Sequence, residues 1–381
     1  MKVLAVEPYG ARSHVAFLEG LARASAHDWT LEVWPPRYWK WRMRTAALGV
    51  RHRVLEERPD VLFVSDFLNL AELRATLPPG ARDLPAVLYF HENQLTYPLR
   101  SGERRDVHYG LTNIHAALAA DRVLFNSAYH RRAFLDASAD LLERSPDLDL
   151  GWAAGELEAR SSVLGLGCDV EVGAPRRLAA DEPPVLVWNH RWEYDKAPER
   201  LADLADELAV RSFDFRLVLL GERFREVPGA LGHLEREHAS RILHSGFAKD
   251  RASYLELLDR GHLLVSTARH EFFGLSTLEG LRRGLLPVLP DDLAYPELLP
   301  EAHRRAPWLY PRAAEVPGEP TSDGGGSCVR AAADAVEAAT ALLRHGEAPA
   351  LAPHTLDQAW ACLGPRFDDV LERALEAAAR R

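Results

Sequence analysis

The sequence predicts an α/β protein made of two doubly wound, Rossmann-like domains. Short apolar runs typical of buried strands alternate with helical segments along most of the chain. This alternation lapses between Asp140 and Pro184 and then starts again. In addition, 381 residues are too many for one ordinary hydrophobic core. We therefore expect one domain at residues 1–170, a second at 180–350, and a helix at 355–381.

The first half of the chain gives five expected strands and five expected helices. The strands are apolar runs at 2–6, 30–34, 61–64, 86–90 and 123–125. The helices begin near Ser13, which is a plausible N-cap, and at 44–57, 67–77, 106–120 and 127–135. No G-x-G-x-x-G pattern follows the first strand, so we expect no dinucleotide site there.

The second half repeats the alternation. Strands are expected at 185–190, 215–220, 242–244, 263–266 and 285–289. Helices are expected at 199–209, 230–238 and 250–258, and another begins near Gly274.

Composition limits the possible functions. A hydrophobic content of 47% and a charged content of 27% describe a globular protein, and no apolar run is long enough to cross a bilayer. The first ten residues resemble a strand more than a signal peptide, so we expect a cytoplasmic protein. The net charge of −10 argues against indiscriminate nucleic-acid binding, and any RNA contact requires a local patch. Three scattered cysteines indicate neither a disulfide framework nor a zinc site.

The segment RHEFFGLSTLEGLRR, at 269–283, carries the strongest functional signal. It lies where an expected strand ends and a helix begins, and the first amides of that helix are expected to form an anion-binding turn. Glu271 and Glu279 frame this turn with seven residues between them. Carboxylates repel phosphate but accept hydrogen bonds from sugar hydroxyls, so the pattern predicts a nucleotide sugar as ligand. The alternative is a surface loop with two solvated glutamates.

Two further segments add candidate residues at strand ends. Arg191 and Lys196 follow the first strand of the second half and suit the growing charge on a departing diphosphate, unless they form a solvated basic loop. His91, Asn93 and Gln94 follow an apolar strand in the first half. His91 is a candidate to orient a sugar or an attacking hydroxyl, and Asn93 and Gln94 are candidates to contact the acceptor RNA.

Basic and aromatic residues interleave at 35–44, in the string PPRYWKWRMR. Unpaired RNA bases stack on aromatic rings while cations meet phosphates, so this mixture suits a single-stranded RNA loop. The alternative is an aromatic cap on the core. The candidate RNA contacts are Arg37, Trp39, Lys40, Trp41, Arg42 and Arg44.

Glu271 and Glu279 with their spacing resemble the signature of retaining glycosyltransferases of the GT-B fold. The blocks EPYGARSH, PPRYWKWRMRT, FHENQLTYP, LFNSAYH and NHRWEYDK, in this order, resemble the tRNA-queuosine α-mannosyltransferase family. The resemblance covers roughly residues 3 to 285. It implies two Rossmann-like domains facing a central cleft, with the terminal helix packing back on the first domain. It also implies retaining transfer of mannose from GDP-mannose to the queuosine base at the wobble position of tRNA-Asp.

The resemblance also implies roles for the site residues. Glu271 holds the hexose near its reacting carbon, Glu279 holds the ribose, and Arg191 and Lys196 are the basic pair. His91 joins Glu271 as a catalytic residue. The remaining donor-site candidates are Phe273, Gly274, Leu275 and Ser276, with Gly10 and Ser13 facing the diphosphate from the first domain. Ala11 stands where the family has a second glycine, which puts close approach of that turn to phosphate in doubt.

We expect no metal and no cofactor beyond the donor substrate GDP-mannose. The expected partners are a nucleotide sugar and queuosine-containing tRNA, with no membrane and no obligate protein partner. Two alternatives stay open from the residues alone. One is a GT-B enzyme with another nucleotide sugar and a small-molecule, lipid or glycan acceptor. The other is a non-catalytic module that binds a nucleotide sugar.

Overall fold

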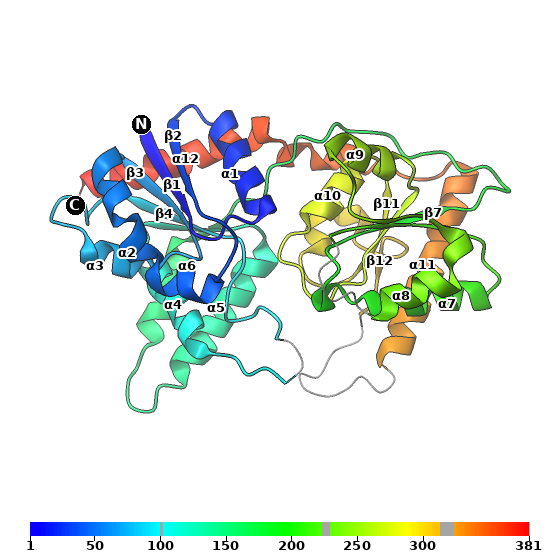
Figure 1. Cartoon of the computed structure of the whole chain (residues 1–381), viewed down its shortest axis with the longest axis horizontal. Coiled ribbons are helices and arrows are strands. Elements are labelled where there is room, and N and C mark those ends of the chain that lie inside the picture. The colour runs from blue at the N-terminus through cyan, green and yellow to red at the C-terminus, as the bar shows by residue number, and fades with distance from the viewer. Residues whose placement is uncertain (100–101, 223–228, 313–323, 381) are drawn as a thin grey trace. The chain divides into compact units, whose positions relative to one another are not determined.

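The computed structural model describes residues 1–99, 102–222, 229–312 and 324–380. The chain forms two compact units (Figure 1). Unit 1 comprises Met1–Gly167 and Asp357–Arg381, and unit 2 comprises Cys168–Leu356. Each unit contains a six-stranded sheet whose paired strands all run parallel. The predicted α/β class with two Rossmann-like domains is confirmed.

The sheet of unit 1 has the strand order β2-β1-β3-β4-β5-β6. Its strands are β1 (Lys2–Glu7), β2 (Asp28–Val33), β3 (Val61–Ser65), β4 (Ala86–Phe90), β5 (Arg122–Phe125) and β6 (Ser161–Val163). The central strands are buried on both faces, which explains their continuous apolar runs. Leu62 and Leu88 point into a core cluster with residues of α2 to α6. Phe63 and Tyr89 point to the opposite face, where their rings meet Phe367 of α12.

Because the sheet of unit 1 is buried on both faces, helices cover each of them. They are α1 (Arg12–Ala24), α2 (Trp39–Glu57), α3 (Leu70–Thr76), α4 (Val107–Ala119), α5 (Ala128–Glu143), α6 (Gly151–Arg160) and α12 (Trp360–Ala379). The chain's last helix, α12, lies beside α1 and the sheet of unit 1 (Figure 1). Asp368 of α12 fixes this position, because its carboxylate accepts hydrogen bonds from the Ser25 hydroxyl at 2.5 Å and the Ala26 amide at 2.8 Å.

The sheet of unit 2 has the order β12-β11-β10-β7-β8-β9. Its strands are β7 (Val185–Asn189), β8 (Arg216–Leu220), β9 (Ile242–Gly246), β10 (Leu263–Val265), β11 (Leu286–Pro290) and β12 (Leu309–Tyr310). Helices α9 (Arg251–Asp259) and α10 (Leu275–Arg282) cover one face. Helices α7 (Pro198–Val210), α8 (Gly229–Glu237) and α11 (Gly324–His345) cover the other (Figure 1).

Several element boundaries differ from the sequence-based expectation. Helix α2 begins at Trp39 and not at 44, so most of the basic-aromatic string is helical. The irregular stretch after 140 contains the end of α5, all of α6 and the edge strand β6. The N-cap of α1 is Ala11 without a side-chain hydrogen bond, so the expected cap by Ser13 is wrong. Among the described residues, no helix combines the length and the apolar character needed to cross a membrane.

Candidate active site

The carboxyl edge of the unit 2 sheet has a topological switch point between β7 and β10. From β7 the chain moves to β8 on one side, and from β10 it moves to β11 on the other. Connections that leave neighbouring strands in opposite directions open a crevice above their carboxyl ends, which is where doubly wound folds bind ligands. Lys196 follows β7 and Glu271 follows β10. The topology therefore brings the two predicted segments together.

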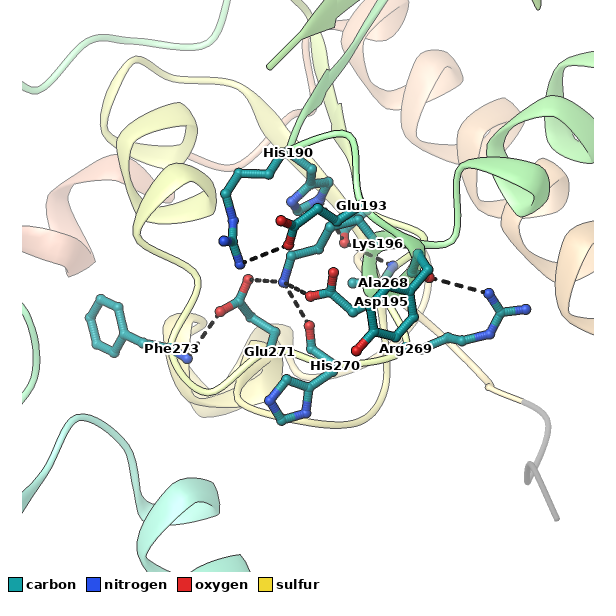
Figure 2. Close-up of polar contacts among 12 residues, drawn as sticks. His190, Glu193, Asp195, Lys196, Ala268, Arg269, His270, Glu271 and Phe273 are labelled. Atoms are coloured by element: carbon teal, nitrogen blue, oxygen red, sulfur yellow. Dashed lines mark hydrogen bonds and ion pairs between the residues drawn. The ribbon is translucent and has the colours of Figure 1, made fainter. Parts of the chain in front are cut away.

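Lys196 is the centre of this edge (Figure 2). Its ammonium group donates to the His270 carbonyl at 2.8 Å and lies 3.0 Å from a carboxylate oxygen of Asp195 and 3.3 Å from one of Glu271. The lysine side chain is 8% exposed and that of Glu271 is 17% exposed. Asp195 also fixes the loop after β10, because its carbonyl accepts hydrogen bonds from the amides of Arg269 and His270.

Burial and mutual attraction act in opposite directions on these charges. Burial raises the pKa of Glu271, but the nearby charges, Lys196 first, outweigh it and bring that pKa to about 2. Burial also opposes charge on Lys196, yet Glu271 and Asp195 raise its pKa above the usual value. Both groups are therefore ionised at neutral pH. His190 and His270 are different, because burial and the neighbouring Lys196 lower the pKa of each to about 3, so both are neutral.

Helix α10 begins at Leu275, four residues after Glu271. Its N-cap, Gly274, has a φ of 89°, a left-handed conformation that favours glycine, and no side chain caps the helix. The amides of the first turn, including those of Leu275 and Ser276, have no partner within the helix and form an anion-binding turn. The Phe273 amide does not belong to this set, because it donates to Glu271 at 3.3 Å (Figure 2). In this structure the Phe273 amide thus helps to orient Glu271.

Glu279 lies inside α10, and both of its carboxylate oxygens have protein partners. One accepts from Arg251 at 2.6 Å and the other from the Tyr254 hydroxyl at 2.5 Å. Asn189, at the end of β7, donates to that same hydroxyl at 2.7 Å and to the Ser276 carbonyl at 3.2 Å. A carboxylate oxygen has capacity for more than one hydrogen bond, so Glu279 can still accept from a ligand while Arg251 and Tyr254 hold it in place.

Arg191 is more exposed than the other three charged residues predicted to bind the nucleotide sugar, Lys196, Glu271 and Glu279. Its guanidinium lies 3.3 Å from Glu193, and 53% of the side chain is exposed. The structure therefore gives the two predicted cations different environments: Lys196 is buried and fixed, whereas Arg191 lies at the surface of the same edge.

The carboxyl edge of the unit 1 sheet holds a second polar cluster. Glu7 ends β1 and is fully buried, and one of its carboxylate oxygens lies 3.2 Å from Nδ1 of His14 and 3.9 Å from Nε2 of His91. The two imidazole rings stack with centroids 4.0 Å apart and planes 12° apart. Phe17 and Tyr89 enclose the His91 ring with edge contacts, and only 6% of its side chain is exposed.

The stacked histidines have opposite pKa shifts. Burial lowers the pKa of His14, but the Glu7 carboxylate outweighs burial and raises it. Burial, with the charges of His14 and His130, lowers the pKa of His91 well below its usual value. The carboxylate of Asp66 accepts a hydrogen bond from the backbone amide of His91 at 2.9 Å. Burial first, and then the charge of Glu92, raise the pKa of Asp66 well above its usual value. His91 is therefore neutral at pH 7.

Gly10 and Ser13 flank this edge. The Gly10 amide donates to the Trp34 carbonyl at 2.8 Å, and a Cβ at this position would lie 2.5 Å from the Val33 side chain. Gly10 is thus required for packing against β2, and its amide is already hydrogen-bonded within the protein. Ser13 is exposed in the first turn of α1.

The two polar residues after β4 differ in accessibility. Asn93 is completely buried, and its side-chain oxygen accepts from the amides of Leu95 at 3.0 Å and Thr96 at 2.9 Å. It stabilises its own turn, so the assignment of Asn93 as an RNA contact is corrected. Gln94 is partly exposed and its side chain donates to Glu92 at 2.9 Å.

The basic-aromatic string forms the start of α2. Tyr38 and Trp41 are 72% and 70% exposed. Arg44 lies over the Tyr109 ring at 5.1 Å, and Arg42 lies over the Trp34 ring at 5.0 Å. Trp39 is partly buried against Tyr109, with Lys40 above it at 5.5 Å. Arg37, Lys40, Trp41 and Arg44 are the exposed members among the predicted contacts.

Sequence reasoning missed several residues of both edges. Asp195, Tyr254, Arg251 and Asn189 fix Lys196 and Glu279, and Glu7 and His14 fix His91. Asn189, Glu7 and Asp66 each stand at or directly after the end of a buried strand, and this signal was available in the sequence. Tyr254 and Arg251 lie on α9, where nothing in their spacing marks them.

Solved structures of glycosyltransferases share the fold over nearly the whole chain. Sucrose-phosphate synthase from Thermosynechococcus elongatus superimposes with a TM-score of 0.67 at 12% identity, covering 99% of this chain and 100% of that one. The Anabaena protein HepE, solved with UDP and glucose, gives a TM-score of 0.64 at 15% identity, covering 98% and 100%. At these identities the likeness establishes the GT-B fold alone.

Sequence relatives are more specific. Residues 2–168 match the family model described as tRNA-queuosine alpha-mannosyltransferase N-terminal. The tRNA-queuosine alpha-mannosyltransferase of Drosophila melanogaster is 36% identical over 313 residues, which cover 78% of this chain and 82% of the relative. A GDP-mannose-dependent phosphatidylinositol dimannoside mannosyltransferase of Mycobacterium tuberculosis is 26% identical over 67% of this chain and 64% of its own length. The resemblance found in the sequence is confirmed: the chain belongs to the tRNA-queuosine alpha-mannosyltransferase family.

Proposed function

We propose that the protein transfers mannose, with retention of configuration, from GDP-mannose to the queuosine base of a tRNA. The observation that carries this proposal is the Lys196–Glu271 pair at the switch point of unit 2, in a chain of this family. Buried opposite charges beside uncapped helix amides suit a ligand in which a diphosphate adjoins a sugar.

We assign donor binding to the carboxyl edge of unit 2. Lys196 and Arg191 face the diphosphate, with the amides of Leu275 and Ser276. Their positive charge stabilises the negative charge that grows on the leaving diphosphate as the sugar–oxygen bond breaks. Glu279, held by Arg251 and Tyr254, accepts from the ribose hydroxyls.

Glu271 is assigned to the hexose, where its ionised carboxylate accepts hydroxyl hydrogen bonds and stabilises positive charge near the reacting carbon. Its lowered pKa makes it a weak base, so it does not take the acceptor's proton. In front-face attack that proton passes to an oxygen of the leaving phosphate, while the acceptor oxygen bonds to the sugar. This mechanism requires positioning and fixed charge, which this site provides.

We assign the acceptor to unit 1. His91, kept neutral, is the group proposed to orient the sugar or the attacking hydroxyl. The exposed start of α2 offers rings for stacking and cations for phosphates, namely Arg37, Tyr38, Lys40, Trp41 and Arg44. Partly buried Trp39 and Arg42 support this surface, and Gln94 follows His91 by three residues in the chain. We further propose that transfer needs no metal ion, membrane or second protein and takes place in the cytoplasm.

A transfer assay tests the proposal. The protein is incubated with radiolabelled GDP-mannose, GDP-glucose or UDP-glucose in separate reactions, each with either queuosine-containing or queuosine-lacking tRNA-Asp of otherwise identical sequence. We expect label in the queuosine-containing tRNA from GDP-mannose alone. If neither RNA carries label while the donor is still hydrolysed, the proposed acceptor is wrong and the proposed donor chemistry stands.

A further inference from the structure

Unit 2 contains a cluster of metal-ligating side chains that the transfer reaction does not use. Asp206 lies on α7, His233 on α8, and His238 directly after α8. One carboxylate oxygen of Asp206 is 2.8 Å from Nε2 of His238, and the other is 3.0 Å from Nε2 of His233. The three ligand atoms all lie within 4.8 Å of one another. Two helices thus point three donor atoms at one place.

These distances are close to those of a zinc site. Zn–N bonds of about 2.0–2.1 Å in a tetrahedral site separate two ligand atoms by about 3.3 Å. Both Asp–His distances lie within about half an ångström of that value. The imidazole planes of His233 and His238 are inclined by 72°, with centroids 6.4 Å apart, so each ring can direct its in-plane lone pair to a common ion.

The surroundings favour a cation and leave it accessible. His238 is 5% exposed and packs near the Phe215 ring, which holds one ligand firmly. Asp206 and His233 have 47% and 38% of their side chains exposed, which leaves a path for an ion and its water. Asp203 lies one helical turn before Asp206, and burial together with the charges of Glu199 and Asp206 raises its pKa. Glu199 and Asp203 thus add two acidic groups near Asp206.

The other group of three donors in the described residues, Glu7, His14 and His91, does not suit a metal in the same way. Its imidazole rings are stacked nearly parallel at 4.0 Å, so their in-plane lone pairs cannot converge on one ion. Two clusters thus meet the same distance condition, and ring orientation separates them.

We propose that Asp206, His233 and His238 bind one Zn²⁺ ion, with water in the fourth position, as a structural clamp between α7 and α8. Two imidazoles and a carboxylate form a donor set that Zn²⁺ prefers over Mg²⁺, which takes oxygen ligands. Asp206 lies eight residues beyond Pro198, the start of α7. That is about 12 Å along the axis from the end nearest Lys196, so the ion stabilises unit 2 and takes no part in transfer.

Metal binding to the full chain tests the clamp. The protein, free of any histidine tag and stripped with EDTA, is titrated calorimetrically with Zn²⁺ and separately with Mg²⁺. We expect one Zn²⁺ per chain, no binding of Mg²⁺, and a rise of several degrees in Tm with Zn²⁺. Co²⁺ as a spectroscopic probe should give the intense visible bands of a tetrahedral site.

Variants locate the ion. His233→Asn and Asp206→Asn change exposed side chains, and each should lower the affinity for Zn²⁺ by at least about tenfold, because even outer-shell losses cost that much. His345→Asn, at an exposed histidine on α11, is the matched control and should bind as the wild type does. Absence of Zn²⁺ binding in the wild type overturns the proposal, as does binding that persists unchanged in both His233→Asn and Asp206→Asn.

Discussion

Both six-stranded sheets are parallel, but their carboxyl edges hold different charged groups. In unit 2 the charges are fixed: the pKa of Glu271 is lowered to about 2 and that of Lys196 is raised. In unit 1 burial raises the pKa of Asp66 and lowers that of His91, while the Glu7 carboxylate raises that of His14. One edge thus holds a buried ion pair, and the other holds a neutral histidine stacked on a second histidine beside a buried carboxylate.

This difference fits the division that we propose between donor and acceptor binding. A departing diphosphate gains negative charge, which a preorganised lysine and helix amides would stabilise without moving protons. On the proposed acceptor side, the lowered pKa of His91 leaves one ring nitrogen free of its proton to accept a hydrogen bond from a hydroxyl.

The largest effect is expected at Lys196. Lys196→Met keeps the length of the side chain and removes the charge, leaving Asp195 and Glu271 without their shared cation. We expect kcat/KM for transfer to fall by about 10³, since a preorganised charge at a reacting phosphate is lost. GDP affinity should fall as well, and both are measured by initial rates and by titration.

Lys2→Met is the control, because Lys2 is an exposed residue of unit 1 at the amino end of β1, away from the carboxyl edge of that sheet. Activity of Lys196→Met within tenfold of the wild type would show that the Lys196–Glu271 ion pair is not needed for donor binding.

Glu271→Gln is expected to act on chemistry more than on binding. The amide keeps the shape but not the charge, so transfer should fall by about 10² while GDP affinity changes only a few fold. The two are compared by single-turnover rates and GDP titration of the same preparation. Parallel losses in rate and GDP affinity would show that Glu271 binds the nucleotide and not the hexose.

The same variant has a pH signature in stability. Since the folded pKa of Glu271 is lowered from 4.5 to about 2, its ionisation stabilises the protein above the unfolded value. That contribution is fully present above about pH 5 and is lost as the pH falls toward 2. The difference in Tm between wild type and Glu271→Gln should therefore be constant from about pH 5 to 8 and shrink below about pH 4. A difference that does not shrink in acid would contradict the ion pair.

A smaller effect is expected on the RNA surface of unit 1. Trp41→Ala removes an exposed ring and should weaken tRNA binding by about tenfold, within the range of 1–3 kcal/mol for one stacked base, without changing GDP affinity. Trp152→Ala is the matched control, since Trp152 is 63% exposed on α6 of the same unit. Equal tRNA affinity in the two variants would exclude Trp41 as a contact.

The smallest effect is expected at Tyr254. Tyr254→Phe removes the hydroxyl that donates to Glu279 and accepts from Asn189. Arg251 still pairs with Glu279 after this change, so the net loss is that of an ordinary hydrogen bond, about 0.5–1.5 kcal/mol. KM for the donor should therefore rise a few fold, with little change in kcat. Steady-state kinetics at saturating tRNA measure this, and a fall in kcat alone would contradict a positioning role.

Much of the fold was predictable because strands buried on both faces are continuous apolar runs, as in Val185–Asn189. The pairing of Lys196 with Glu271 was not, since 75 residues separate them and only the strand order brings β7 beside β10. The buried state of Asn93 and the used amides of Gly10 and Phe273 also depend on tertiary contacts. No pattern along the chain records these contacts.

The start of α2 could not be predicted from the local sequence pattern. Aromatic and basic residues at 37–44 have no strong helical pattern, and packing decides that the helix begins at Trp39, with Met43 buried in the core.

The most direct test of the division between the two edges is a pair of titrations on three proteins. GDP and queuosine-containing tRNA are each titrated into the wild type, Lys196→Met, and a triple variant of the α2 surface, Arg37→Ser/Lys40→Ser/Trp41→Ser. We expect Lys196→Met to weaken GDP binding alone and the triple variant to weaken tRNA binding alone. Weakening of both ligands by either variant would contradict separate donor and acceptor edges.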